Sequence, residues 1–303
     1  MNILGKRYIF FGLSLILIVP GLIILFTGGL PLSIDFTGGS LLEVSFANAK
    51  PAPADIIALY EEANIKDAQV QTSETGSYII RSEFLEDSVR DGILTAMADK
   101  IGEPTVVQFD SVGPSIGQQV TSRAAMAVAV AAILVVVFIA WSFRGVQNAF
   151  RYGISAILAM LHDVALIFSI TAMGGLFFGW EIDSLFLTAL LTVIGFSMQD
   201  SIVVFDRIRE NATILRRLDY ETLVNHSIVQ TLQRSINTQL MTVEFLLLAL
   251  ALFGGVTLQE FSVVLLVGLM SGTYSSIFIA APILVVWEKQ EWKTWFRRKE
   301  AAA

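Results

Sequence analysis

The sequence predicts a polytopic α-helical membrane protein with six transmembrane helices and a small α+β domain between the first and second helices. Of its 303 residues, 54% are hydrophobic and 16% are charged, and the mean hydropathy is +0.68. This composition is too apolar for a soluble globular protein. Apolar runs of about 20 residues, the length that crosses a bilayer as a helix, recur along the chain. Residues 29–122 contain no such run.

The first apolar run follows two basic residues, Lys6 and Arg7, and no small-residue cleavage site follows it. We therefore expect an uncleaved membrane helix and not a signal peptide. The polar, amphipathic stretch 207–233 is expected to be a cytoplasmic loop along the membrane interface. The six predicted spans are Tyr8–Phe26, Ala124–Trp141, Gly153–Phe178, Ser184–Phe205, Ser235–Phe253 and Phe261–Trp287.

The segment between the first two spans alternates strand-like and helix-like pieces in the order β-α-β-β-α-β, which is that of a ferredoxin-like sandwich. The pieces are Leu41–Phe46, Pro53–Asn64, Ala68–Thr72, Tyr78–Ser82, Glu86–Ile101 and Pro104–Asp110. The segment Gly28–Ser122 carries 14 acidic and five basic residues. This acidic balance disfavours nucleic acid and anionic lipid surfaces as partners of the domain.

The distribution of lysine and arginine predicts the orientation. The short loops 178–183 and 254–259 contain neither residue, whereas the opposite ends of the spans are rich in both. By the positive-inside rule, both termini and the stretch 207–233 are cytoplasmic. The predicted organisation is a cytoplasmic N-terminus with the first helix (1–28), an extracytoplasmic domain (29–122), a five-helix bundle (123–287) and a basic cytoplasmic tail (288–303).

The residue types present argue against an enzyme. The chain has no cysteine and two histidines, which excludes disulfides, thiol nucleophiles and histidine-rich metal sites. No phosphate-binding loop or nucleophile–base pair is visible in the sequence. We therefore expect no catalytic activity, no bound metal and no cofactor.

An acidic residue inside a predicted span marks a candidate functional site. Asp200 lies within the fourth span, where a charged side chain costs about 2.5–3.5 kcal/mol to insert. Arg234 begins the fifth span from the same side and is expected to reach Asp200. A nearby arginine would keep the carboxylate charged, and its departure would favour the protonated acid. Asp200 is thus the candidate ion carrier and Arg234 its gate, with an ordinary interfacial arginine as the alternative.

Other polar residues accompany Asp200. Asp163 lies near the middle of the third span beside His162. Both are ion-coupling candidates, and the alternatives are helix packing for Asp163 and a hydrogen bond between helices for His162. Asp206 and Arg207, at the inner end of the fourth span, are expected to form a surface or interface pair. Glu244 has no partner that the sequence identifies.

Four stretches in order along the chain match signatures of one known family. They are Ser33–Gly39 with the D-F-x-G-G motif (Asp35, Phe36, Gly38 and Gly39), Ala159–Val164 with the A-x-x-H-D motif, Gly195–Asn211 around Asp200, Asp206 and Arg207, and Arg234–Thr238. The chain therefore resembles SecF, the family of smaller subunits of the bacterial SecDF protein-export complex, within the resistance-nodulation-division superfamily.

The resemblance implies a role and a set of partners. A SecF subunit pairs with SecD in a twelve-helix unit of the bacterial cytoplasmic membrane and assists the SecYEG channel and the SecA motor, with YajC and YidC as further candidate partners. Proton-motive force, or a sodium gradient in some members, drives the outer domains to act on unfolded preprotein. By motif position, Asp200 corresponds to the proton-carrying aspartate of the family and Arg234 to its arginine partner.

The sequence departs from the family pattern at four positions, which are Phe196, Gln199, Gln239 and Glu244. These departures leave the carrier in place but bear on the choice of ion. Two other functions remain as alternatives. One is half of an ion-coupled lipid or drug exporter, against which a single small domain and six spans argue. The other is a non-conducting membrane scaffold, against which Asp200 argues.

Overall fold

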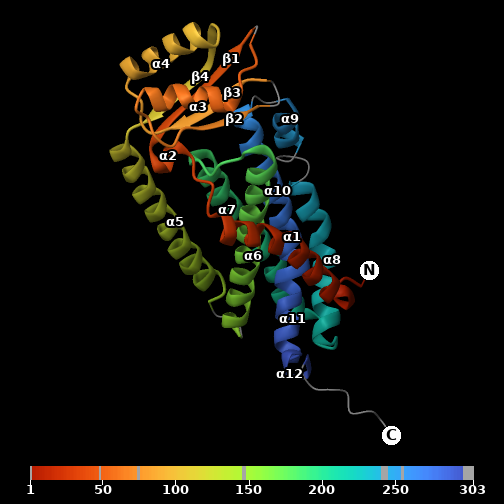
Figure 1. Ribbon diagram of the computed structural model, residues 1–303. Coiled ribbons are helices and arrows are strands. Elements are labelled where there is room, and N and C mark those ends of the chain that lie inside the picture. Colours follow the sequence, from red (N-terminus) through yellow and green to blue (C-terminus); the bar gives the residue numbers. More distant parts are fainter. Residues whose placement is uncertain are drawn as a thin grey trace. The chain divides into compact units, whose positions relative to one another are not determined.

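The computed structural model describes residues 2–47, 49–73, 76–144, 148–239, 245–253 and 256–295 (Figure 1). The chain divides into two compact units. One comprises residues 1–31 and 128–303 and is helical, and the other comprises residues 32–127 and is built on a four-stranded sheet.

The sheet unit follows the predicted order of elements. After a short helix α2 (Ile34–Thr37), the elements are β1 (Gly39–Phe46), α3 (Pro53–Glu62), β2 (Gln69–Thr72), β3 (Tyr78–Ser82), α4 (Asp87–Lys100) and β4 (Pro104–Val112). The strands lie in the order β2-β3-β1-β4, and every neighbouring pair is antiparallel. In the central register Leu42 of β1 lies opposite Ile80 of β3 and Phe109 of β4.

One apolar core holds this unit together. Alternate residues of β1 and β3 are buried, as expected for strands that cover a core with one face. Both helices contribute to the same cluster, so they cover one face of the sheet. Its members include Leu42, Val44, Tyr78 and Ile80 from the strands and Ile56, Tyr60, Ile93 and Met97 from the helices.

The paired glycines form a tight turn between α2 and β1. Gly38 and Gly39 have φ values of 73° and 129°, in the region where only glycine is unstrained. A Cβ atom on Gly117, in the first turns of the next helix, would lie 2.7 Å from the Gly38 nitrogen. Asp35 and Phe36 lie within α2. The motif therefore allows two backbone segments to approach closely.

The helical unit contains most of the apolar residues. Its principal helices are α1 (Arg7–Gly28), α5 (Pro114–Ser142, which begins in the sheet unit), α6 (Ala149–Phe178), α7 (Ser184–Ile214), α8 (Tyr220–Gln239), α9 (Phe245–Phe253), α10 (Val256–Ser275) and α11 (Ala281–Lys289). A short 3-10 helix (Leu4–Lys6) precedes α1, a π-helical segment (Ser276–Ala280) joins α10 to α11, and α12 (Trp292–Trp295) follows. Within the described residues, five helices are long and apolar enough to cross a membrane, namely Leu4–Gly28, Pro114–Ser142, Ala149–Phe178, Ser184–Ile214 and Leu258–Lys289.

Two regions differ from the expected layout. The predicted span Ser235–Phe253 includes residues 240–244, which lie outside the described residues, so it stays a prediction. The stretch 207–233 is helical apart from residues 215–219, because α7 continues to Ile214 and α8 begins at Tyr220. Its apolar residues Leu223 and Ile228 are buried against other helices, and its place along a membrane interface stays a prediction.

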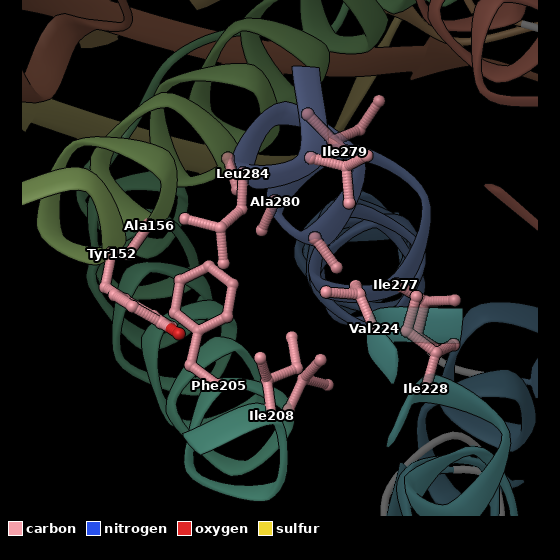
Figure 2. Close-up of a cluster of buried hydrophobic side chains, with 14 of the residues drawn as sticks. Tyr152, Ala156, Phe205, Ile208, Val224, Ile228, Ile277, Ile279, Ala280 and Leu284 are labelled. Carbon is pink, nitrogen blue, oxygen red and sulfur yellow. The ribbon is translucent and has the colours of Figure 1, made fainter. Parts of the chain in front are cut away.

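An apolar core fills one end of the helical unit. Figure 2 shows side chains from α6, α7, α8 and the π-helical segment converging around Phe205. Tyr152 meets Phe205 edge to face, with ring centroids 5.4 Å apart, an arrangement that aromatic rings prefer. Phe205, Ile208 and Ile228 are fully buried.

The rest of the helical unit is apolar outside and polar inside. Helices α1 and α5 expose apolar side chains, among them Ile16 and Phe26 on α1 and Ile133 on α5. The buried polar residues lie mainly on α6, α7 and α10, and include Asp163, Ser169, Ser197, Asp200, Ser201, Ser271 and Ser275. This distribution is the one expected of helices in lipid, where small polar residues mediate contacts between helices.

Glycine brings α1 and α6 into close contact. A Cβ atom on Gly21 would overlap the backbone and hydroxyl of Ser169 on α6. The hydroxyl of Ser169 donates a hydrogen bond of 2.8 Å to the Leu17 carbonyl on α1. The two helices therefore pack backbone to backbone, as small residues permit in membranes.

A charged cluster joins helix ends of the same unit. We call Arg7, Glu221, Lys289 and Glu291 the helix-end cluster. Arg7 pairs with Glu221 at 3.0 Å and with Glu291 at 2.5 Å, and Lys289 also pairs with Glu221. The hydrogen bond from Lys289 and the charge of Arg7 lower the pKa of Glu221 below its usual range.

Candidate functional site

Asp163 lies on α6 at the centre of a hydroxyl cluster. Its side chain is 1% exposed. Ser197 of α7 donates a hydrogen bond of 2.5 Å to Oδ2, and Ser275 of α10 donates one of 2.6 Å to the same oxygen. Ser271 of α10 donates a hydrogen bond of 2.5 Å to Oδ1. Three helices therefore converge on one carboxylate.

His162 extends this cluster to the first helix. Its Nδ1 lies 3.0 Å from Oδ1 of Asp163, and its Nε2 lies 2.9 Å from the hydroxyl of Ser14 on α1. The imidazole stacks on the ring of Tyr274, with centroids 6.0 Å apart. The Tyr274 hydroxyl lies 3.3 Å from Ser14 and donates a hydrogen bond of 2.9 Å to the Phe10 carbonyl. His162 is thus hydrogen-bonded between helices.

Asp200 has a different environment on α7. It is 8% exposed. Gln239 of α8 and Thr273 of α10 each donate a hydrogen bond of 3.1 Å, and both go to Oδ2. Among the residues that the structure describes, no hydrogen bond reaches Oδ1. The carboxylate is therefore buried with half of its acceptor capacity filled by protein.

The expected contact between Asp200 and Arg234 is not formed in the described part of the chain. Arg234 is exposed on α8, and no ion pair joins its guanidinium to Asp200. Gln239 occupies that position instead. Five residues along an α-helix correspond to a rotation of about 140°, so Arg234 and Gln239 lie on different faces. Ser235, one turn before Gln239, shares the buried face.

Helix α10 touches both carboxylates, which the sequence interpretation missed. Ser271 and Ser275 donate to Asp163, and Thr273 donates to Asp200. A Cβ atom on Gly272 would lie 3.2 Å from the Cα of Ser197, so α10 packs closely on α7. The signal available in the sequence was the run S-G-T-Y-S-S inside an apolar span. The π-helical segment that follows is a feature often found at functional sites.

The remaining predicted residues lie elsewhere. Asp206 pairs with Arg209 at 2.5 Å, and Arg207 pairs with Glu210 at 2.8 Å. These are exposed pairs one turn apart on α7, so Asp206 and Arg207 do not pair with each other. Glu244 lies outside the described residues.

The polar groups of the site are joined by hydrogen bonds. Within the described ranges, no group of three or more histidine, cysteine or acidic residues could hold a metal ion. Two buried carboxylates, one imidazole and several hydroxyls lie on helices that contact one another. Such groups can hold a proton and change their hydrogen bonds when it leaves.

Two models of one protein family match most of the chain, including both carboxylates of the site. Residues 93–290 match the model of the protein export membrane protein SecD/SecF, C-terminal. Residues 23–50, which include the paired glycines, match the SecD/SecF GG motif.

Relatives and solved structures give the same result. The chain is 61% identical to the protein translocase subunit SecF of Anaerolinea thermophila, over 98% of this chain and 97% of that protein. It is 44% identical to the SecF of Thermobaculum terrenum, over 100% and 99%. The crystal structure of SecDF, a translocon-associated membrane protein from Thermus thermophilus, matches with a TM-score of 0.81 at 33% identity, covering 95% of this chain and 39% of that one. The chain therefore belongs to the SecF family of protein translocase subunits, among the SecD/SecF export membrane proteins.

Proposed function

We propose that the chain acts as the SecF subunit of a SecDF unit, which uses an ion gradient to assist preprotein translocation. In the matching SecDF structure, this chain corresponds to 39% of a longer polypeptide. A separate SecD subunit would supply the remainder. The gradient is that of protons, with sodium ions as the alternative, and no further cofactor is required.

The observation that carries the proposal is the buried carboxylate of Asp200. It lies between α8 and α10 with two uncharged donors on one oxygen. In the part of the chain that the structure describes, no ion pair is formed to Asp200, and an ionisable group buried in a membrane bundle is by default assigned to an ion pathway. Each proton that crosses 100 mV releases about 2.3 kcal/mol. Because Gln239 and Thr273 both contact Asp200, its change of charge would shift the packing of their helices.

The proposal includes an orientation and a set of partners. Both termini would lie in the cytoplasm of a bacterium, and the bundle would cross the cytoplasmic membrane. Residues 29–122 would form an extracytoplasmic ferredoxin-like domain, which the strand order β2-β3-β1-β4 and the two helices support. Unfolded preprotein, the SecYEG channel, SecA, YajC and YidC are the expected partners.

The test is preprotein export in cells whose only copy carries Asp200→Asn. The amide keeps the shape and one acceptor oxygen but removes the titrating group. We expect export to lose its dependence on the proton-motive force. Assembly with SecD must match that of the wild type, which co-purification would verify.

The matched control is Asp219→Asn, the same chemical change at an exposed residue before α8. The Asp219 side chain accepts a hydrogen bond from the Thr222 nitrogen, and asparagine can retain it. Wild-type export by the control and ion-independent export by Asp200→Asn support the proposal. Ion-dependent export by Asp200→Asn at the wild-type rate would favour a scaffold role.

A further inference from the structure

We propose that Asn211 of α7 is a positioning residue, which holds α8 in the register that presents Gln239, and not Arg234, to the carboxylate of Asp200. The inference rests on the proposed role of Asp200 and adds the residue that selects its partner. It follows from hydrogen bonds that join α7 and α8 at two places and from the spacing of the buried residues between them.

Asn211 joins α7 to the first half of α8. Its side chain is buried, with 5% of the residue exposed. The amide nitrogen donates hydrogen bonds of 2.8 Å to Oγ of Ser227 and of 2.9 Å to Oε1 of Gln230. Ser227 in turn donates its hydroxyl proton to the Leu223 carbonyl at 2.9 Å. Because a hydroxyl has one proton, Ser227 must accept at its contact with Asn211.

A stripe of buried polar residues runs along α8 from this contact. Ser227, Thr231, Ser235 and Gln239 follow one another at intervals of four residues, and each is at most 5% exposed. Residues four apart are neighbours on one face of a helix. Arg234 is exposed, because a step of one residue from Ser235 rotates the side chain by about 100°. A contact that holds Ser227 against α7 therefore also turns Gln239 inward and Arg234 outward.

The contacts at the two ends of the stripe fit one axial register. Asp200 and Asn211 are eleven residues apart on α7, and Gln239 and Ser227 are twelve residues apart on α8. At 1.5 Å per residue these separations are about 16.5 Å and 18 Å. To present Arg234 in place of Gln239, α8 would have to move by about 7.5 Å along its axis and rotate by about 140°. The hydrogen bonds of Asn211 would be broken by such a movement.

The first turns of α8 have further anchors. Asn225 accepts hydrogen bonds of 2.8 Å and 3.4 Å from the backbone nitrogens of Ile3 and Leu4, and the helix-end cluster contacts the first turn. Toward the other end of α8, the Thr238 hydroxyl bonds to a carbonyl of α8 itself. Loss of the contact with α7 should therefore leave the first turns in place and allow the later turns to rotate.

The register determines which charge faces Asp200. Gln239 supplies an uncharged donor at 3.1 Å, whereas Arg234 would supply a positive charge. An arginine beside a buried carboxylate forms an ion pair, and breaking such a pair is costly. By keeping Arg234 outside, Asn211 leaves the carboxylate with partners that it can exchange.

The test measures the rotation of α8 with a cysteine reporter, because the chain has no cysteine of its own. Ser235→Cys places a thiol on the buried stripe, and the Ser235 hydroxyl has no hydrogen-bond partner among the described residues that this exchange could remove. Asn211→Leu keeps the branched shape of the side chain and removes both hydrogen bonds. In the full chain in detergent micelles, N-ethylmaleimide should label the thiol about tenfold faster in the presence of Asn211→Leu.

Two controls separate rotation from unfolding. Asn237→Leu makes the same exchange on the exposed face of α8 and should leave the labelling rate unchanged. Ser262→Cys places a thiol at a buried position of α10, where the serine hydroxyl bonds to Leu258 of the same helix, and Asn211→Leu should not change its rate. Equal acceleration at positions 235 and 262, or no acceleration at position 235, would overturn the proposal.

A milder variant keeps the test decisive if Asn211→Leu does not fold. Gln230→Leu removes one of the two hydrogen bonds from the exposed side of α8 and leaves Ser227 bonded to Asn211. We expect it to accelerate labelling at position 235 by less than Asn211→Leu does. If Gln230→Leu is the variant that folds, an unchanged rate would overturn the proposal.

The labelling result is independent of export. Faster labelling in Asn211→Leu together with ion-dependent export in Asp200→Asn would retain the positioning role of Asn211 and refute the carrier role of Asp200. Unchanged labelling together with loss of ion dependence in Asp200→Asn would do the reverse.

Discussion

Asp163 and Asp200 are buried carboxylates on neighbouring helices, yet their surroundings differ. Both oxygens of Asp163 are hydrogen-bonded, with contacts of 2.5 to 3.0 Å from four side chains. Asp200 receives two contacts of 3.1 Å on one oxygen. The first carboxylate is enclosed by hydroxyls and an imidazole, and the second has an amide and a single hydroxyl.

The difference separates two tasks. Hydrogen bonds to a charged group contribute more than neutral ones, and their loss leaves a buried charge unsatisfied. Asp163 is therefore suited to hold α6, α7 and α10 in a fixed arrangement. The partners of Asp200 can leave at a smaller cost, so this carboxylate is suited to change its environment. Helix α10, which touches both, is the element through which the two can affect each other.

The largest effect is expected when each carboxylate is replaced by its amide. In Asp163→Asn the amide nitrogen would face hydroxyl donors and leave buried hydrogen bonds unmade, so the free energy of unfolding should fall by about 3–5 kcal/mol. In Asp200→Asn the remaining oxygen can accept both hydrogen bonds, and the loss should stay below about 1 kcal/mol. Equilibrium unfolding in detergent micelles measures the loss of stability in each variant. Equal losses would contradict the proposed difference between Asp163 and Asp200.

The next effect compares one donor from each site. Ser197→Ala deletes a short hydrogen bond to Asp163 and should cost about 1.5–3 kcal/mol. Thr273→Val deletes one of the longer bonds to Asp200 and should cost about 0.5–1.5 kcal/mol. The double variants with Asp163→Asn and Asp200→Asn give the coupling energy of each pair. A larger coupling for Thr273 than for Ser197 would reverse the ranking of the two sites.

The sequence predicted the elements well where a local pattern determines them. The strand–helix alternation of the sheet unit is reproduced with boundaries that differ by two residues or fewer, because alternating burial and turn residues are local properties. The second span begins at Pro114 and not at Ala124, since helix continues beyond the apolar run that hydropathy detects. Five of the six predicted spans correspond to helices that are long and apolar enough to cross a membrane, because length and apolarity are also local properties.

The candidate site was predicted only in part, because its contacts join distant helices. Asp163 and Asp200 stood out as acids in apolar spans, and both are buried. The partner of Asp200 depends on the rotation of α8 about its axis, which places Gln239 inward and Arg234 outward. The pattern of residues within the fourth span does not determine this rotation. The hydroxyls of α10 look like ordinary small residues until the carboxylates that they contact are known.

A smaller effect tests whether the packing of α1 against α6 influences the surroundings of Asp163 and His162. In Gly21→Ala the added methyl group would overlap Ser169, so the free energy of unfolding should fall by about 1–3 kcal/mol. Gly12→Ala is the control, because a Cβ atom there meets nothing within 4 Å, and it should be neutral or stabilising. If displacement of α1 disturbs His162, its nitrogen NMR signals should change in Gly21→Ala and stay constant in Gly12→Ala. If the His162 signals are unchanged in both variants, the packing of α1 does not influence the site.

The smallest effect concerns a carboxylate outside the spans, Glu221 of the helix-end cluster, as a contrast to the buried pair. Lys289 and Arg7 lower its pKa below the usual 4.5, so its ionised form stabilises the folded chain above that pH. The stabilisation is lost as the pH falls through the lowered value. Relative to Glu221→Gln, the wild type should therefore gain less than about 1 kcal/mol near neutral pH, because the side chains remain partly solvated. Unfolding at several pH values measures the gain, and a difference that persists in acid would mean that Glu221 acts through packing and not through its charge.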